Sequence, residues 1–266
     1  MSHFRTLIAL LFAALAALNG HAEEGRHVRI ATGEWLPYVS QSLPQHGALA
    51  QLITEAFARA GYTVEYGYFP WSRGYELVKK GEWDATMPYY CSPERQKLFY
   101  CSEPLVQGEQ VFFHLKGKAP PWETLADLKG VPIGATLGYY YGEEFEEAER
   151  NGTLSIKRIA SDETNMKLLF MGRIRLFPQD KMVGYSVARR LFPASLDELT
   201  HDPRPLHTQA LHLIFPRKGE RGKKLLDIFN REFLALKANG TVQRYLQAML
   251  DGEYERGITP VPPSGN

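Results

Sequence analysis

Apolar residues recur along this chain with two different spacings. Between residues 47 and 60 the apolar positions are three or four residues apart, which is typical of the buried face of an α-helix. Shorter apolar and aromatic runs on either side, at 28–31 and 62–69, have the length and composition of β-strands. Gly61 stands after the first helical segment, where glycine commonly ends a helix. The pattern therefore predicts alternating strands and helices.

The same alternation continues to residue 250. It predicts helices at 47–60, 71–80, 122–128, 145–150, 180–192, 221–237 and 242–250, with two more that begin after Ser92 and Ser161. It predicts strands at 28–31, 62–69, 85–90, 98–101, 110–115, 131–135, 155–160, 174–178 and 211–215. Repeated strand–helix–strand units imply an α/β protein with open, mostly parallel sheets covered by helices.

A connection rich in lysine and proline, at 116–121, divides this pattern into two runs. Because each run has its own strands and helices, we expect two lobes. In open α/β sheets ligands bind beyond the carboxyl ends of the strands, and often between domains. A binding cleft is therefore expected between the two lobes.

Charge and targeting narrow the class of protein. Residues 1–22 have the pattern of an export signal, with Arg5, an apolar run and small residues before the cleavage point, so we expect a periplasmic protein. The chain has 31 Lys and Arg against 30 Asp and Glu, and removal of Arg5 leaves 30 of each. A neutral chain gives no electrostatic reason to expect nucleic acid or an anionic membrane as a partner.

The segment 81–104, GEWDATMPYYCSPERQKLFYCSEP, holds the strongest candidate for binding chemistry. Its strand leads into Ser92-Pro93-Glu94, which offers a capping hydroxyl, a proline at the first helical position and an acid in the first turn. Arg95 follows in that turn. Free backbone N–H groups and a guanidinium fork at one place form a receptor for a carboxylate. The alternative is an ordinary solvated helix arginine.

This segment resembles the signature region of the bacterial extracellular solute-binding proteins of family 3, the amino-acid-binding receptors of ABC importers. The similar motifs are GE-x-DA, a strand, S-P-E-R and F-Y-C-S-E-P-L, and the resemblance extends from about residue 27 to 254. It implies a type II periplasmic-binding fold, in which two lobes are joined by a two-crossing hinge with the ligand cleft between them. The implied division is a signal peptide (1–22), lobe I (23–113 and 210–254), lobe II (114–209) and a C-terminal tail (255–266).

The resemblance also implies roles for individual residues. Arg95 matches the arginine that binds the α-carboxylate of the ligand, although the interval from strand to arginine is one residue shorter here. Asp180 matches a carboxylate that binds the α-ammonium, and an ordinary helix N-cap is its alternative role. Arg175 stands where the family usually has aspartate, so an extra positive charge near the cleft is expected to affect ligand choice.

Further candidates lie in turns. Trp35, Tyr38 and Trp71 follow strands, where amphipathic aromatic rings suit a half-wet cleft, although each alone also suits a lid over the core. Tyr90 ends the strand before Arg95. The turn at 136–142 resembles the family's second-lobe loop, in which Gly138 permits close backbone approach and Tyr139 contacts the ligand or lies on the surface.

Cys91 and Cys101 are the only two cysteines, and they flank the helix that holds Arg95. Because an exported protein meets an oxidising environment, we predict a disulfide between them. The alternatives are a reactive thiol pair and a metal site, but the spacing lacks the CxxC form and a neighbouring histidine. Neither a metal nor a cofactor is expected.

These observations predict a monomeric periplasmic solute-binding protein that captures a small zwitterion, a polar amino acid, for an ABC permease in the inner membrane. Motifs of hydrolases, zinc proteases, P-loop proteins and dinucleotide-binding enzymes are absent from the sequence. Two alternatives stay open. One is a ligand-sensing module of a signalling system, and the other is a periplasmic enzyme, for which Glu34 is the candidate acid or base.

Overall fold

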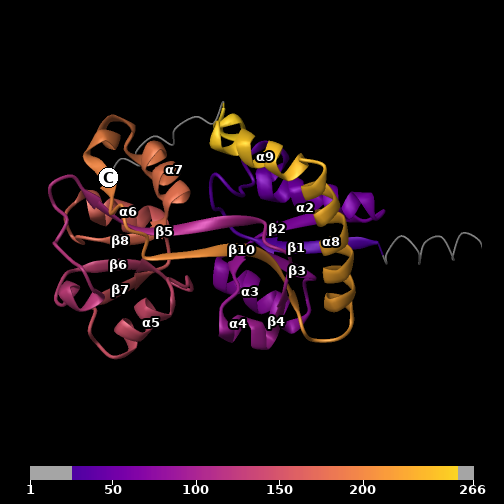
Figure 1. The fold of residues 1–266 in the computed structure, drawn as a ribbon, viewed down its shortest axis with the longest axis horizontal. Helices are drawn as coiled ribbons and strands as arrows, with labels where there is room; N and C mark the ends of the chain where they lie inside the picture. Colours follow the sequence, from indigo (N-terminus) through magenta and orange to yellow (C-terminus); the bar gives the residue numbers. More distant parts are fainter. Residues whose placement is uncertain (1–25, 257–266) are drawn as a thin grey trace, which may run out of the picture.

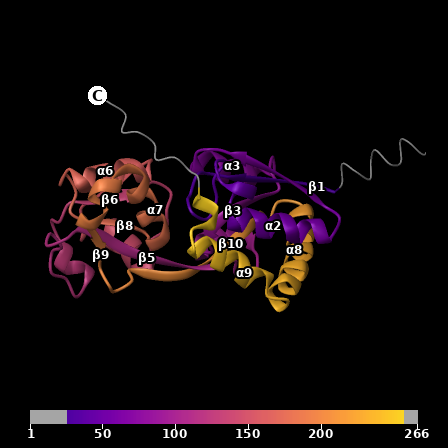
Figure 2. The ribbon, with the colours of Figure 1, turned by 90° about the horizontal axis from the view of Figure 1, so that it is seen from above.

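The computed structural model describes residues 26–256. The predicted signal peptide (1–22) and residues 257–266 of the predicted tail lie outside the described residues. Figure 1 shows two bodies side by side, with β5 (Val106–Leu115) and β10 (His207–Pro216) running from one to the other. Seen from above, in Figure 2, the same two strands connect the same two bodies.

The helices and strands occur in the predicted alternating order. The helices are α2 (Ala48–Arg59), α3 (Trp71–Lys80), α4 (Pro93–Leu98), α5 (Glu143–Arg150), α6 (Asp162–Phe170), α7 (Lys181–Leu191), α8 (Arg221–Ala238) and α9 (Thr241–Leu250). The other strands are β1 (His27–Thr32), β2 (Thr63–Tyr68), β3 (Ala85–Tyr90), β4 (Phe99–Cys101), β6 (Ile133–Thr136), β7 (Ile156–Ile159), β8 (Phe177–Asp180) and β9 (Leu199–His201). Short 3₁₀ helices are η1 (Pro44–His46), η2 (Leu125–Leu128), η3 (Pro193–Glu198) and η4 (Glu253–Glu255).

The expectation of mostly parallel sheets is wrong. The larger sheet has the strand order β2-β1-β3-β10-β5-β8, with β4 also paired to β10 and β9 to β5, while β6 and β7 form a second sheet. Only the pairs β1–β2, β1–β3 and β6–β7 are parallel among these strands. Every pairing of β5 and β10 is antiparallel, because these strands cross between the bodies in opposite directions.

The crossing strands fix how the two bodies meet. The first half of β5 pairs with the first half of β10, from Gln110 opposite His207 to Val106 opposite Leu211. Beyond this shared segment β5 pairs with β8 and β9, whereas β10 pairs with β3 and β4. The placement of the lobe boundaries near residues 114 and 209 stays a prediction, and both positions lie within these long strands.

The apolar faces predicted for the helices are buried. On α2, Leu49, Leu52, Ile53, Ala56 and Phe57 have no exposed surface. The face of α8 that contains Phe229 packs against α2, with 5.6 Å between the ring centroids of Phe57 and Phe229. A separate apolar cluster lies within the second body and includes Phe112, Tyr141 and Phe145. Each body therefore has apolar side chains of its own to hold its half of the cleft.

Local end signals are confirmed where they were predicted. Ser92 caps α4 by accepting the backbone N–H of Arg95 (3.3 Å), and Ser161 caps α6 by accepting that of Thr164 (3.2 Å). Gly81 ends α3 in the left-handed conformation, with φ 79°. These caps place the polar ends of α4 and α6 in fixed positions.

Several boundaries differ from the prediction, and β5 and β10 each begin four residues before the predicted strand. In place of the helix predicted at 122–128 there is only the 3₁₀ helix η2. The strand predicted at 174–178 is shifted along the chain, because β8 begins at Phe177 and ends at Asp180. Glu255, expected in the tail, lies in η4 and accepts a hydrogen bond from Ser186 of α7 (2.6 Å). Within residues 26–256, no helix combines the length and the apolar character needed to cross a membrane.

Candidate functional site

A cavity lies between the two bodies, at the point where β5 and β10 cross. It encloses about 30 Å³, which is room for little more than a water molecule. Six of the eight predicted ligand-binding residues line it, whereas Tyr38 and Asp180 do not. The lining residues are Trp35, Trp71, Pro88, Tyr89, Tyr90, Arg95, Gln110, Gly138, Tyr139, Tyr140 and Leu211.

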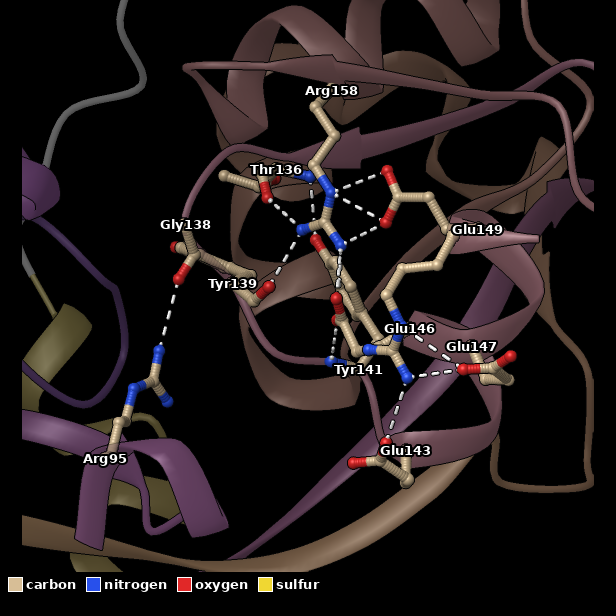
Figure 3. A network of polar contacts seen from close by, with 11 residues as sticks. Arg95, Thr136, Gly138, Tyr139, Tyr141, Glu143, Glu146, Glu147, Glu149 and Arg158 are labelled. Carbon is tan, nitrogen blue, oxygen red and sulfur yellow. Dashed lines mark hydrogen bonds and ion pairs between the residues drawn. The ribbon is translucent and has the colours of Figure 1, made fainter. Parts of the chain in front are cut away.

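Arg95 connects the two bodies across this cavity. Its guanidinium donates to the backbone oxygen of Tyr90 (2.9 Å), on its own body, and to that of Gly138 (3.2 Å), on the other. Figure 3 shows the second of these bonds reaching from α4 to the loop that contains Gly138. The ring of Tyr89 lies beneath the guanidinium carbon, at 4.8 Å from the ring centroid. Arg95 is thus a fixed cation rather than the freely solvated helix arginine considered as its alternative.

Burial lowers the pKa of the Arg95 guanidinium from its ordinary value. The side chain stays positively charged, because an arginine titrates far above physiological pH. Backbone carbonyls and an aromatic face orient a guanidinium without neutralising it. Its remaining N–H groups are therefore available to a carboxylate, with which two parallel hydrogen bonds form a strong, oriented pair.

Three of the aromatic rings that line the cavity pack against one another. Trp35, Trp71 and Tyr139 lie at almost equal distances, with ring centroids 6.3, 6.2 and 6.4 Å apart. Their planes are close to perpendicular, at 79°, 89° and 84°. Trp35 and Trp71 come from one body and Tyr139 from the other, so a ligand of amino-acid size requires these rings to separate.

Tyr139 belongs to the loop that follows β6, and polar contacts hold this loop in place. The Tyr139 hydroxyl and the Thr136 hydroxyl both donate to the carboxylate of Asp162, at 2.9 and 2.5 Å. Burial raises the pKa of Asp162 to about 6, although the two hydroxyl donors oppose the rise. Gly138, at the tip of the loop, has a φ of 82°, which L-residues with a side chain rarely adopt.

Asp180 is buried, with 1 % of its surface exposed, and caps α7. Its carboxylate accepts the backbone N–H groups of Met182 (3.0 Å) and Val183 (3.3 Å), so its alternative role as a helix N-cap is confirmed. The Tyr38 hydroxyl donates to the same carboxylate (3.2 Å). Burial raises the pKa of Asp180 to about 6, against these donors. The role of Asp180 as an ammonium ligand stays a prediction.

Gln110 is one of the cavity residues that sequence reasoning missed. It is completely buried in β5, and its Nε2 donates to the Tyr90 hydroxyl (3.0 Å). Its Oε1 has no hydrogen-bond partner, and neither has the indole N–H of Trp35, which is also buried. The signal was a polar amide at the start of an apolar strand, but only the crossing with β10 brings Gln110 to the cleft.

Tyr89, Pro88 and Leu211 line the cavity as well and were not predicted to do so, and so does Tyr140 of the turn at 136–142 that resembles the family's second-lobe loop. Tyr89 and Pro88 lie in β3, which was treated only as the strand leading to Arg95. Arg175 is exposed and does not line the cavity. Glu34 accepts the backbone N–H of Gln41 (3.1 Å).

Beyond Trp71 and Tyr139 the cleft continues into a second space of about 430 Å³. Both bodies contribute to its walls, and its charged residues are Glu34, Asp162, Glu163 and Arg190. Arg190 is paired with Glu163 at 2.6 Å. The aromatic rings thus separate the small cavity from this more acidic space, and Arg95, Gly138 and Tyr140 also line a third space of about 420 Å³.

The predicted disulfide is confirmed. Cys91 and Cys101 are bonded, with Cα atoms 6.3 Å apart, so β3, α4 and β4 form one cross-linked unit around Arg95. The alternatives of a reactive thiol pair and a metal site do not apply to these bonded cysteines. Among the described residues, no group of three or more His, Cys, Asp or Glu side chains is arranged to hold a metal ion.

A family model described as "Bacterial extracellular solute-binding proteins, family 3" matches residues 29–251. A search of curated proteins finds no significant relative. Among solved structures, the amino acid ABC transporter substrate-binding protein AbpA from Streptococcus pneumoniae, bound to L-arginine, is 14 % identical with a TM-score of 0.72. That alignment covers 89 % of this chain and 100 % of AbpA.

Two other solved structures have the same TM-score of 0.72. An ancestral arginine-binding protein bound to arginine is 17 % identical, over 84 % of this chain and 98 % of its own. A histidine kinase sensor domain with similarity to periplasmic binding proteins is 19 % identical, over 85 % of this chain and 97 % of its own. At these identities the likeness shows the fold alone.

Proposed function

The chain belongs to the bacterial extracellular solute-binding proteins of family 3, with a type II periplasmic-binding fold, and on that premise we propose that it captures an amino acid for import. The ligand is a small zwitterion, bound in the cleft between the two bodies. The protein acts as a periplasmic monomer and presents the ligand to the permease of an ABC transporter in the inner membrane. Two of its structural neighbours are described as bound to arginine, which supports an amino acid as ligand.

The position and orientation of Arg95 give this proposal its strongest support. It lies at the cavity wall, oriented by the backbone oxygen of Tyr90 and the ring of Tyr89, with N–H groups left for a carboxylate. A guanidinium fork held in this way suits a carboxylate better than a freely moving ammonium does. The α-carboxylate of the ligand therefore binds here.

Two buried polar groups in the cleft have no hydrogen-bond partner, and a zwitterion carries groups that suit both. A buried donor or acceptor without a partner costs about 1–3 kcal/mol, so the closed cleft leaves both Trp35 Nε1 and Gln110 Oε1 unfavourably placed. A ligand that carries both an acceptor and a donor relieves both. Gln110 and Asp180 are the two acceptors proposed for the α-ammonium.

Binding requires a hinge motion. The space of about 30 Å³ among Trp35, Trp71, Tyr139 and Arg95 is too small for an amino acid, so a ligand placed between these rings needs Trp35 and Trp71 to move away from Tyr139. β5 and β10 connect the bodies and are the segments that absorb the rotation. Closure then adds the contacts of the second body, and the ligand stabilises the closed state by its higher affinity for it.

The ligand is tested with the purified protein. We expect mass spectrometry of the denatured protein to identify a co-purified amino acid, and calorimetric titration with the twenty L-amino acids to show binding. The carboxamide of the bound amino acid should bind at least about tenfold more weakly, since it loses about 1.4 kcal/mol or more at Arg95. Failure of every amino acid to bind would contradict the proposal.

A ligand-sensing function is the second candidate, because one structural neighbour is a histidine kinase sensor domain. Both functions use the same cleft, so they differ in the partner rather than in the ligand. Loss of ligand uptake in cells that lack the protein supports import. Unchanged uptake together with a lost transcriptional response supports sensing.

A further inference from the structure

The loop between β6 and α5 is held from both sides by arginines. From the first body, Arg95 donates to the backbone oxygen of Gly138 (3.2 Å). From the second body, Arg158 of β7 donates to the oxygens of Thr136 (3.2 Å) and Tyr139 (2.8 Å) through one nitrogen, Nη1. Along the chain, the two residues whose carbonyls bind Arg158 stand before and after Gly138, whose carbonyl binds Arg95, and Figure 3 shows both sets of bonds.

Arg158 uses all of its N–H groups. Besides the two loop oxygens, its Nε donates to both carboxylate oxygens of Glu149 (3.0 and 3.1 Å). Its Nη2 donates to Glu149 (2.6 Å) and to Glu146 (3.0 Å). The guanidinium also lies over the ring of Tyr141, at 5.4 Å from the centroid. An arginine bonded through every donor has little freedom to move.

Glu146 extends this arrangement to the backbone of the same loop. Its carboxylate accepts the N–H of Tyr141 (3.1 Å) while it is paired with Arg158. The side chains of Arg158, Glu146 and Glu149 are 18 %, 22 % and 27 % exposed, so these ion pairs are screened less than surface pairs. Burial lowers the pKa of Arg158, but the bond to Glu149 and the neighbouring carboxylates raise it overall.

We propose that Arg158 is a positioning residue of the binding cleft. It fixes the loop so that the Gly138 carbonyl meets Arg95 and the Tyr139 ring meets Trp35 and Trp71 when the two bodies close. Arg158 itself does not line the cavity, so it acts through the loop. The inference rests on the proposed function, because the loop contacts matter for ligand affinity only if the cleft closes on a ligand.

The first test needs no ligand. Arg158→Met should speed hydrogen–deuterium exchange at the backbone N–H groups of Tyr139 and Tyr141 by at least about tenfold, because their acceptors lose their anchor. Arg150→Met is the matched control. Arg150 also pairs with glutamates of α5, but it is 57 % exposed and makes no bond to the loop, so exchange should stay within about twofold. Unchanged exchange in Arg158→Met overturns the proposal.

The second test separates positioning from general destabilisation. The probe is L-arginine, or whichever of the twenty amino acids binds the parent more tightly, titrated into the parent, Arg158→Met, Arg95→Lys and the double variant. If Arg158 acts through the contact between Gly138 and Arg95, Arg158→Met should weaken binding at least about tenfold when Arg95 is present. In the Arg95→Lys background the same substitution should weaken binding less than about threefold. An equal loss in both backgrounds shows that Arg158 does not position the Gly138 carbonyl for Arg95, and this overturns that part of the proposal.

The two experiments distinguish a failure of the proposed function from a failure of the proposed role of Arg158. If the parent binds no amino acid, the proposed function fails, and the exchange experiment still decides whether Arg158 fixes the loop. If Arg158→Met does not fold, Arg158→Lys takes its place, because lysine keeps the charge toward Glu146 and Glu149 without the planar fork. Arg158→Lys should then show intermediate exchange, and parent-like exchange would contradict the inference.

Discussion

Asp180 illustrates how one side chain serves the fold at the edge of the binding cleft. Its carboxylate caps α7 and accepts the Tyr38 hydroxyl from the other body, and it is almost completely buried. A residue that caps a helix is placed by that helix, so the cap alone explains its position. Its proposed contact with the ligand ammonium needs the cleft to rearrange around Tyr38.

Asp180→Asn separates the two roles. Asparagine caps helices about as well as aspartate, so the free energy of unfolding should change little at pH 4, where the raised pKa of Asp180 keeps its carboxyl mostly neutral. If Asp180 binds the ammonium, calorimetric titration should show weaker binding of the free amino acid and unchanged binding of its N-acetyl derivative. An equal change for both ligands, or none for either, would leave Asp180 as a cap alone.

The candidate residues that sequence reasoning located best are those set by local rules. Ser92, Pro93 and Arg95 follow one another at a helix start, so their geometry depends on a few neighbouring residues. Gln110 could not be found in this way. Its place at the cavity depends on the pairing of β5 with β10, about a hundred residues further along the chain, and no local pattern encodes that pairing.

At the scale of elements, β3, α4 and β4 form the unit that presents Arg95. Arg95 is bonded to Tyr90 at the end of β3, and β4 pairs with β10. The disulfide between Cys91 and Cys101 closes this unit, with ten residues of separation. Because α4 has only six residues, it depends on these flanking contacts rather than on its own helical stability.

Replacing both cysteines should therefore destabilise the protein. For a loop of this length the chain-entropy model gives about 2–3 kcal/mol, which denaturant unfolding of Cys91→Ser/Cys101→Ser measures directly. Thiol titration of the denatured, unreduced parent should find no free thiol. Two titratable thiols per chain in the parent, or an unchanged unfolding midpoint in the variant, would contradict this account of the unit.

Most elements could be predicted from the sequence because their signals are local. Helix α3 and strand β3 begin and end at the predicted residues, and the buried face of α8 was read from its periodicity. The sheet directions could not be predicted correctly. Strand–helix–strand order favours parallel pairing, but β5 and β10 return between the bodies and pair antiparallel, which only the three-dimensional path determines.

At the scale of the whole molecule, two buried carboxyls affect stability. The pKa values of Asp162 and Asp180 are both about 6, raised chiefly by burial from an unfolded value near 3.8. A carboxyl with a raised pKa binds its proton more tightly in the folded state. Its stabilising contribution is therefore present below about pH 4 and is lost as the pH rises through about 6.

Comparison of the parent with Asp162→Asn should measure this loss of stability. The free energy of unfolding of the parent, relative to that of Asp162→Asn, should fall by about 2–3 kcal/mol between pH 4 and pH 6, since each pKa unit corresponds to about 1.4 kcal/mol. Chemical denaturation of both proteins at several pH values measures this difference, and groups common to both cancel. A difference that stays constant or rises with pH would show that Asp162 is not buried as described.

The whole account depends on closure of two bodies around Arg95. Trp35 and Trp71 meet Tyr139 across the cleft, and Arg95 meets Gly138 beside them. The same arginine is thus proposed to bind the ligand carboxylate and to link the bodies. Its substitution should affect binding more than any other single change in the cleft.

Calorimetric titration of Arg95→Ala with the amino acid that binds the parent tests this claim most directly. Because charge-assisted hydrogen bonds contribute about 1.5–3 kcal/mol, binding should weaken about tenfold to a hundredfold, and Arg95→Lys should restore only part of it. Arg59→Ala, which removes an arginine of α2 paired with Glu232, is the control and should bind like the parent. If folded Arg95→Ala binds as tightly as the parent, the carboxylate does not bind at Arg95 and the proposed site is wrong.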